Sequence, residues 1–156
     1  MPLILEERFI PINLIGQGGF GRTFLARDLR SPNQLQQVVI KQLCPQIPSG
    51  QSHLTPLVLE RIRNLFHQEG MVLRALHHSQ IPQVYTSFVV ETLASPNPSS
   101  TISNGQQQFY YLVQEYIEGR NLLQELQQNG KFSGREIVEF LQQMLSVIGY
   151  IHIQVK

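Results

Sequence analysis

Three glycines with the spacing of a phosphate-binding loop stand near the start of the chain, in the stretch LIGQGGFGRTF: Gly16, Gly18 and Gly21. Glycine lets a backbone approach a ligand closely, so that its N–H groups reach phosphate oxygens. Further on, Lys41 ends the apolar run VVIK and could supply a positive charge to the same phosphates. The pattern indicates nucleotide binding; the alternatives are a flexible turn without a ligand and a solvated lysine at the end of a strand.

Two other kinds of glycine-rich phosphate loop do not fit these residues. A dinucleotide-binding fingerprint needs a helix directly after the glycines and an acidic residue about 20 positions further on. Here RTFLARD, which follows Gly21, is a strand pattern, and the residue at that distance is Lys41. A Walker-type loop needs Gly-Lys followed by Ser or Thr, which is absent. A glycine-rich hairpin with a lysine on the next strand remains, as in the amino-terminal lobe of protein kinases.

Four motifs in the right order carry a family resemblance: GQGGFGRTFLA, VVIK, a helical Glu69 and EYIEG. Over about Phe9 to His152 the chain resembles a bacterial Hanks-type serine/threonine protein kinase, similar to cyanobacterial members. The resemblance implies an α+β fold, with a twisted five-stranded antiparallel sheet and one long helix in an amino-terminal lobe. We expect this lobe at residues 1–118, with an insertion at 93–108, and two helices of an incomplete carboxy-terminal lobe at 119–156.

The resemblance also implies ATP as the ligand and suggests which residues meet it. The three glycines would fold over the triphosphate with Phe20 at the hairpin tip, and Lys41 would hold the α- and β-phosphates while pairing with Glu69. The other expected contacts are the adenine roof (Ile15, Thr23 and Val39), the hinge (Glu115 and Ile117, with Gln114 before it as gatekeeper) and Asn121 near the ribose. The family usually has valine at the position of Thr23 and alanine at that of Val39, so Val39 adds bulk above the ring.

The catalytic parts of the family have no counterpart here. In the family, a helix ending like YIH leads to a His-Arg-Asp loop and later to Asp-Phe-Gly, which supply the catalytic base and the magnesium ligands. The sequence ends with YIHIQVK. We therefore expect a truncated domain with no catalytic residue and no metal site, inactive alone and binding ATP very weakly or undetectably. Micromolar affinity for ATP with magnesium would overturn this expectation.

The elements that must position these residues follow from periodicity. Strand-like runs are FIPINLIG, GRTFLARD, QLQQVVIKQL, QVYTSFVVET and FYYLVQEYI. Pro56 to Leu76 has a helical apolar period, with Glu69 on the apolar face. A carboxylate there is costly unless a cation meets it, and pairing with Lys41 accounts for its place. The alternatives are a helix rotated so that Glu69 reaches the edge, and Glu60 as the partner instead.

The carboxy-terminal part reads as a mobile insertion followed by two helices. LASPNPSSTISNGQQQ predicts a long hairpin loop, and Asn121 can cap a short helix that ends at Asn129-Gly130. Ser133 to Glu136 has the form of a capping box and opens an amphipathic helix. The apolar stripe of this helix is Ile137, Leu141, Met144, Leu145, Ile148 and Ile151.

That stripe leaves three functions open. It could pack on the amino-terminal lobe or self-associate in an inert fragment. It could dock a protein partner at 137–151, which would make the chain a non-catalytic, pseudokinase-like interaction module. It could also bind a separate chain that supplies the catalytic loop, restoring kinase activity.

Composition bounds the remaining classes. With 12 basic and 11 acidic residues and a net charge of +1, nothing favours nucleic acid or a membrane surface as partner. Cys44 is the only cysteine, there is no apolar run of roughly 18 residues and no signal-like start, so we expect a cytoplasmic protein. His77 and His78 are adjacent and cannot form an i, i+4 metal pair.

Overall fold

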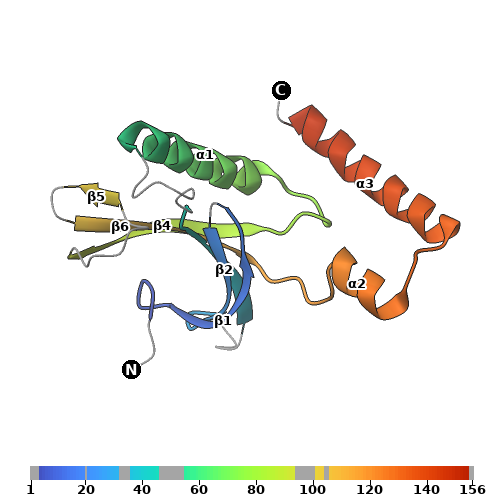
Figure 1. Ribbon diagram of the computed structural model, residues 1–156, viewed down its shortest axis with the longest axis horizontal. Helices are drawn as coiled ribbons and strands as arrows, with labels where there is room; N and C mark the ends of the chain where they lie inside the picture. Colours follow the sequence, from blue (N-terminus) through green and yellow to red (C-terminus); the bar gives the residue numbers. More distant parts are fainter. Residues whose placement is uncertain are drawn as a thin grey trace. The chain divides into compact units, whose positions relative to one another are not determined.

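The computed structural model describes residues 4–19, 21–31, 36–45, 55–93, 101–103 and 106–154. The chain forms two compact units. The first combines Met1–Ala75 with Gln83–Tyr116, and the second combines Leu76–Pro82 with Ile117–Lys156. The first contains every strand and one helix, α1, and the second contains helices α2 and α3 (Figure 1).

The first unit is built on one antiparallel sheet with the strand order β1-β2-β3-β6-β4, and a short strand, β5, pairs with β6. The strands are β1 (Phe9–Gln17), β2 (Gly21–Asp28), β3 (Gln36–Leu43), β4 (Val84–Leu93), β5 (Thr101–Ser103) and β6 (Gln106–Glu115). The predicted α+β fold with five main antiparallel strands is confirmed.

Strands extend into both ends of the segment 93–108, where a hairpin insertion is expected. β4 runs to Leu93, β6 already begins at Gln106, and 101–103 pair with β6 as β5. Backbone ladder bonds hold these segments, whose side chains are almost all polar, so no apolar alternation marked them as strands. The rest of the expected insertion, 94–100 and 104–105, lies outside the described residues.

Side chains alternate along the strands, so one face of the sheet packs in the core and the other faces α1. In β3, Val38 and Ile40 are fully buried in a core with Phe9 and Val113. Because side chains alternate, Val39 and Lys41 point to the opposite face. That second face is the one that α1 approaches, as the contact between Lys41 and Glu69 shows.

A half-buried ion pair fixes the start of the sheet. The Arg8 guanidinium donates from Nε and Nη2 to the two carboxylate oxygens of Asp28, at 2.8 and 2.7 Å, and the Arg30 N–H donates to the same carboxylate. The hydrogen bonds from Arg8 hold the pKa of Asp28 below its usual value, although burial acts in the other direction. The Asp28 side chain is only 5% exposed and that of Arg8 33%, so the acid is buried and the pair as a whole is half-buried.

Helix α1 (Pro56–Ala75) rests on the sheet through a narrow contact. Its one buried residue is Gly70, where a Cβ would lie 3.1 Å from Leu112 Cδ1. Leu65, from the predicted apolar stripe, is exposed, as are Leu57 and Met71. The helix is present as predicted, but few of its side chains are buried against the sheet.

The second unit contains α2 (Leu122–Asn129) and α3 (Gly134–Gln154). Both predicted helix starts are present: the Asn121 side chain accepts from Gln124 N–H, and Ser133 and Glu136 bond to each other reciprocally. The bonds from Ser133 lower the pKa of Glu136. Among the described residues, no helix is long and apolar enough to cross a membrane.

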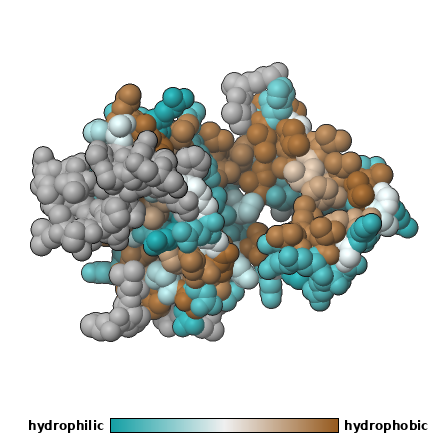
Figure 2. Space-filling view, viewed as in Figure 1, coloured by the Kyte–Doolittle hydropathy of each residue, from teal (hydrophilic) through white to brown (hydrophobic). Residues whose placement is uncertain are grey.

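Helix α3 has no buried residue. Most of its predicted stripe is exposed, and Figure 2 shows apolar side chains gathered over α2 and α3. The exposed members are Ile137, Leu141, Met144, Leu145 and Ile148, while Ile151 is half-buried. Within this unit much of the face is therefore uncovered.

Candidate functional site

The glycine-rich stretch forms the hairpin between β1 and β2. Gly16 pairs with Thr23 in the ladder, and the Gly18 N–H donates to the Gly21 carbonyl at 2.9 Å to close the turn. Phe20, expected at the tip, lies outside the described residues. The predicted hairpin is therefore formed by two extended strands, with no helix after Gly21.

The three glycines differ in what an added side chain would meet. A Cβ on Gly21 would lie 2.4 Å from the backbone oxygen of Gln42 on β3, so no side chain fits there. A Cβ on Gly18 would meet nothing within 4 Å, and one on Gly16 would make only an ordinary contact with Thr23. Gly21 is thus needed for close strand packing, whereas Gly18 leaves open space where a ligand can approach.

Lys41 and Glu69 come together as predicted. Nζ of Lys41 on β3 lies 3.1 Å from Oε1 of Glu69 on α1, whereas the alternative, Glu60, does not form this bond. The carboxylate is more exposed than its place on the apolar face of the helix suggests: the Lys41 side chain is 34% exposed and that of Glu69 47%. The loose contact of α1 with the sheet leaves the pair in reach of water, where an ion pair contributes at most about 1 kcal/mol.

These residues line a cavity of about 270 Å³ beneath the hairpin. The wall residues are Gly18, Gly19, Gly21, Arg22, Thr23, Lys41, Gln42, Phe66 and Glu69. Open backbone at the hairpin and an ammonium opposite it are the two features that a chain of phosphates needs. The cavity is therefore suited to a polyphosphate, with Glu69 orienting the lysine.

Of the three residues expected to form the adenine roof, Thr23 and Val39 lie on the face of the sheet that carries Lys41, whereas Ile15 lies away from the cavity. Thr23 is the ladder partner of Lys41 and lines the cavity, and Val39 on the same strand face is almost fully buried. Val39 is also the ladder partner of the expected gatekeeper, Gln114. Ile15 lies beside a bulge in β1, is half exposed and does not line the cavity.

The expected hinge begins where β6 ends. The Glu115 N–H donates to the Gln83 carbonyl at 2.8 Å, and its carboxylate accepts from the Gln83 N–H at 3.2 Å. This side chain thus ties the strand to the segment before β4, a structural role that the sequence did not reveal. Ile117 and Asn121 belong to the second unit, where the Asn121 side-chain oxygen already caps α2.

The bonding of the aspartate and the grouping of possible metal ligands bear on catalysis. Asp28 is the one aspartate of the sequence, and both of its carboxylate oxygens are bonded to Arg8. Within the described ranges, no three His, Cys, Asp or Glu side chains are grouped so that they could hold a metal. His78 accepts from the Gln80 N–H through Nδ1 and packs on Tyr150, so it has a structural role.

Comparison with known proteins agrees with this geometry. The protein kinase domain family matches residues 9–155. Serine/threonine-protein kinase F of Synechocystis sp. is 37% identical over 97% of the chain and 29% of its own length. Serine/threonine-protein kinase B of the same organism is 35% identical, and serine/threonine-protein kinase PknA of Nostoc sp. 32%, each over 97% of the chain and 23% of its own length. The chain thus spans less than a third of these relatives.

Proposed function

Because the chain belongs to the protein kinase domain family, we propose that its first unit binds the triphosphate of ATP beneath the β1–β2 hairpin. The unit corresponds to a kinase amino-terminal lobe, and the second unit to the start of a carboxy-terminal lobe. The names of the relatives favour a protein whose family phosphorylates serine and threonine hydroxyls.

The observation that carries this proposal is the bond between Lys41 and Glu69 at the floor of a glycine-walled cavity. An ammonium near phosphates is most effective when a second group holds it in place, because less side-chain freedom is lost on binding. The Glu69 carboxylate, fixed on a helix, does this. Because the pair is half exposed, it adds little to the free energy of unfolding. Its role is to orient Lys41 toward the α- and β-phosphates.

The remaining contacts follow from the strand faces. Thr23 and Val39 lie on the same face as Lys41, where the flat adenine ring would pack, and the bulk of Val39 limits the fit. Glu115 and Ile117 would offer backbone groups to the ring edge, with Gln114 behind it. We expect Asn121 to contribute little to the ribose, since its side-chain oxygen is used in capping.

Residues 1–156 supply binding without the parts that transfer phosphate. Phosphoryl transfer depends on a base that positions the hydroxyl and on magnesium ions that neutralise charge. The single aspartate is held by Arg8, and the described residues do not offer a magnesium cage. We propose that these residues alone bind ATP more weakly than micromolar and transfer no phosphate.

A second candidate function rests on α3. Five members of its apolar stripe are exposed within their unit, and together they form a surface of the kind that binds another protein. The chain would then act as an interaction module, or as one half of an active enzyme completed by a chain that carries the catalytic loop.

One experiment separates these functions. We would incubate the 156-residue chain with radiolabelled ATP, magnesium and casein, alone and with cell lysate, and measure ATP affinity by calorimetry. No transfer and affinity weaker than micromolar are expected for the chain alone. Transfer by the purified chain, or micromolar affinity, would contradict the proposal. Transfer that appears only with lysate and is lost with Lys41→Met would favour completion by a second chain.

A further inference from the structure

The wall of the cavity beneath the β1–β2 hairpin includes one residue that is expected around the adenine ring, Thr23. Val39, two residues before Lys41 on β3, is almost fully buried and does not line the cavity, and neither does Ile15. The described wall therefore surrounds the part of a ligand that lies next to Lys41 and not the ring. A hydroxyl group in such a wall is placed to meet phosphates.

Thr23 stands in a row of residues that crosses the sheet. Gly16 on β1 is its ladder partner on one side, and Lys41 on β3 is its partner on the other. Directly paired residues project from the same face of a sheet, with Cβ atoms about 5 Å apart. The Thr23 hydroxyl and the Lys41 side chain are therefore neighbours on the face that α1 approaches.

The Thr23 hydroxyl is open to a ligand. A Cβ on Gly16 would lie 3.8 Å from Thr23 Oγ1, so the glycine leaves the space beside the hydroxyl uncovered. Among the residues that the structure describes, this hydroxyl has no hydrogen-bond partner. A threonine hydroxyl carries one donor that rotates to suit its acceptor, so it can donate to a ligand oxygen.

The Lys41 ammonium leaves room for a further donor. It has three N–H donors, and one of them is used for Glu69 Oε1 at 3.1 Å. The Glu69 carboxylate also offsets part of the positive charge that a triphosphate would meet. A neutral donor next to Lys41 adds a hydrogen bond to the phosphates without disturbing the ion pair.

The other polar side chains of β2 and β3 at this wall lie on the opposite face. Arg22 and Gln42 line the cavity and are ladder partners. The Gln42 side chain donates from Nε2 to the hydroxyl of Tyr111, which belongs to the core. Because side chains alternate along a strand, Arg22 also projects on that side, away from Lys41. The phosphates are thus left to Thr23, Lys41 and the hairpin backbone.

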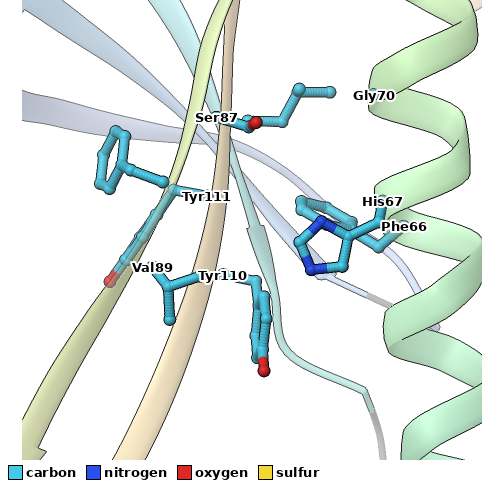
Figure 3. A pocket seen from close by; sticks show the side chains of 9 residues that line it. Phe66, His67, Gly70, Ser87, Val89, Tyr110 and Tyr111 are labelled. Carbon is cyan, nitrogen blue, oxygen red and sulfur yellow. The ribbon is translucent and has the colours of Figure 1, made fainter.

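A second hollow does not offer the same chemistry. Its volume is about 80 Å³, it lies between α1 and the strands β4 and β6, and it shares only Phe66 with the first cavity. Figure 3 shows Phe66 and His67 reaching from α1 toward the strands that carry Ser87 and Tyr110. Its described wall residues include no lysine or arginine, the usual partners of a phosphate group. The cavity with Lys41 is therefore the one suited to a triphosphate.

We propose that Thr23 is a phosphate-binding residue, whose hydroxyl donates to a non-bridging oxygen of the triphosphate beside the oxygen held by Lys41. The linear triphosphate, more than the base, then supplies the binding free energy, and inorganic tripolyphosphate is a sufficient ligand. The methyl group of Thr23 retains an apolar contact for the ring. This role rests on the proposed nucleotide site, since Lys41 must hold the neighbouring phosphate.

The test follows backbone amide NMR of the isotope-labelled 156-residue chain during separate titrations with magnesium tripolyphosphate, magnesium ATP and adenosine. Both phosphate ligands should shift the amides of Thr23 and Lys41 with Kd values within about threefold of each other. Adenosine at the same concentrations should shift neither amide. Thr23→Val, which has the same shape without the hydroxyl, should weaken both phosphate ligands by about threefold to tenfold.

Two variants separate the hydroxyl from the shape of the residue. Thr23→Ser keeps the hydroxyl and loses the methyl group, so its Kd for tripolyphosphate should stay within about twofold of the wild type. Thr86→Val is the matched control, because Thr86 is half-buried on β4 of the same sheet and does not line the cavity. It should change this Kd by less than about twofold. Unchanged amide shifts outside the hairpin and β3 show that a variant is folded, and Thr23→Ala replaces Thr23→Val if that variant is not.

The outcomes distinguish this role of Thr23 from the nucleotide site itself. Undiminished tripolyphosphate binding by Thr23→Val, or equal weakening by Thr86→Val, would overturn the role of the hydroxyl. Tighter ATP binding by Thr23→Val would assign the residue to the ring, and binding of ATP without tripolyphosphate would show that the base dominates; both would overturn the inference and leave the nucleotide site in place. Absence of any shift at Lys41 in the wild type, or shifts that survive Lys41→Met, would overturn the nucleotide site as well.

Discussion

Replacing Gly21 with alanine is expected to destabilise the first unit, although no ligand is involved. The added Cβ would lie 2.4 Å from the Gln42 backbone oxygen, whereas ordinary contacts begin at 3.4 Å, so the β2 and β3 backbones must separate by about 1 Å. A backbone oxygen in a ladder cannot move aside as a side-chain tip does. Such overpacking costs about 1–3 kcal/mol, or about 2–10 °C in Tm for a chain of this length.

Gly18→Ala is the control for this prediction, because a Cβ there meets nothing within 4 Å. Urea unfolding followed by circular dichroism should place Gly18→Ala within about 0.5 kcal/mol of the wild type and Gly21→Ala clearly below it. ATP binding should respond to both, since Gly18 leaves the space that the phosphates occupy. Equal stability of Gly21→Ala and the wild type, or an equal loss in Gly18→Ala, would refute the distinction between the two glycines.

Three further substitutions test the core, the Arg8–Asp28 pair and the more exposed Lys41–Glu69 pair. Phe9→Ala should cost about 3–5 kcal/mol in urea unfolding, since Phe9 is fully buried and stacks on Phe88; a loss below about 1 kcal/mol would contradict its place in the core. Asp28→Asn should cost about 1.5–3 kcal/mol at pH 7 by the same measurement, the range for hydrogen bonds to a charged group, because the Arg8 side chain left behind is one-third exposed. Because Arg8 lowers the folded-state pKa of Asp28, this contribution is present above about pH 4 and is lost as the pH falls through that lowered value, so wild type and variant should converge in acid. A difference that does not change between pH 7 and pH 2 would exclude this origin. Lys41→Met should change stability by less than about 1 kcal/mol, because its ion pair is half exposed, and it should still abolish ATP binding; a larger loss of stability would mean that the pair holds the fold.

Much of the first unit could be predicted from local patterns. Alternating runs such as QVVIKQL set both the strand and its two faces, because side chains alternate along a strand whatever it pairs with. The glycine hairpin and the capping residues Asn121 and Ser133 were likewise visible, since each depends on chemistry within a few residues.

The features that the sequence did not predict all depend on contacts between residues far apart in the chain. The burial of Glu69 was overestimated because helical periodicity gives the face of a helix and not how closely that face approaches a sheet. Gly21 is also needed because the Gln42 carbonyl of the next strand lies where a Cβ would be, and this contact is not visible in the sequence. Likewise, the structural role of the Glu115 carboxylate depends on its hydrogen bond with Gln83. The pairing of 101–103 with β6 left no apolar signal in the sequence.

A titration of isotope-labelled chain with magnesium-ATP, followed by backbone amide NMR, tests the nucleotide site most directly. Millimolar ATP should shift the amides of Gly16, Gly18, Thr23 and Lys41, and Lys41→Met should remove these shifts while leaving the rest of the spectrum in place. Shifts confined to residues outside the hairpin and β3, or shifts that survive in Lys41→Met, would contradict the proposed site.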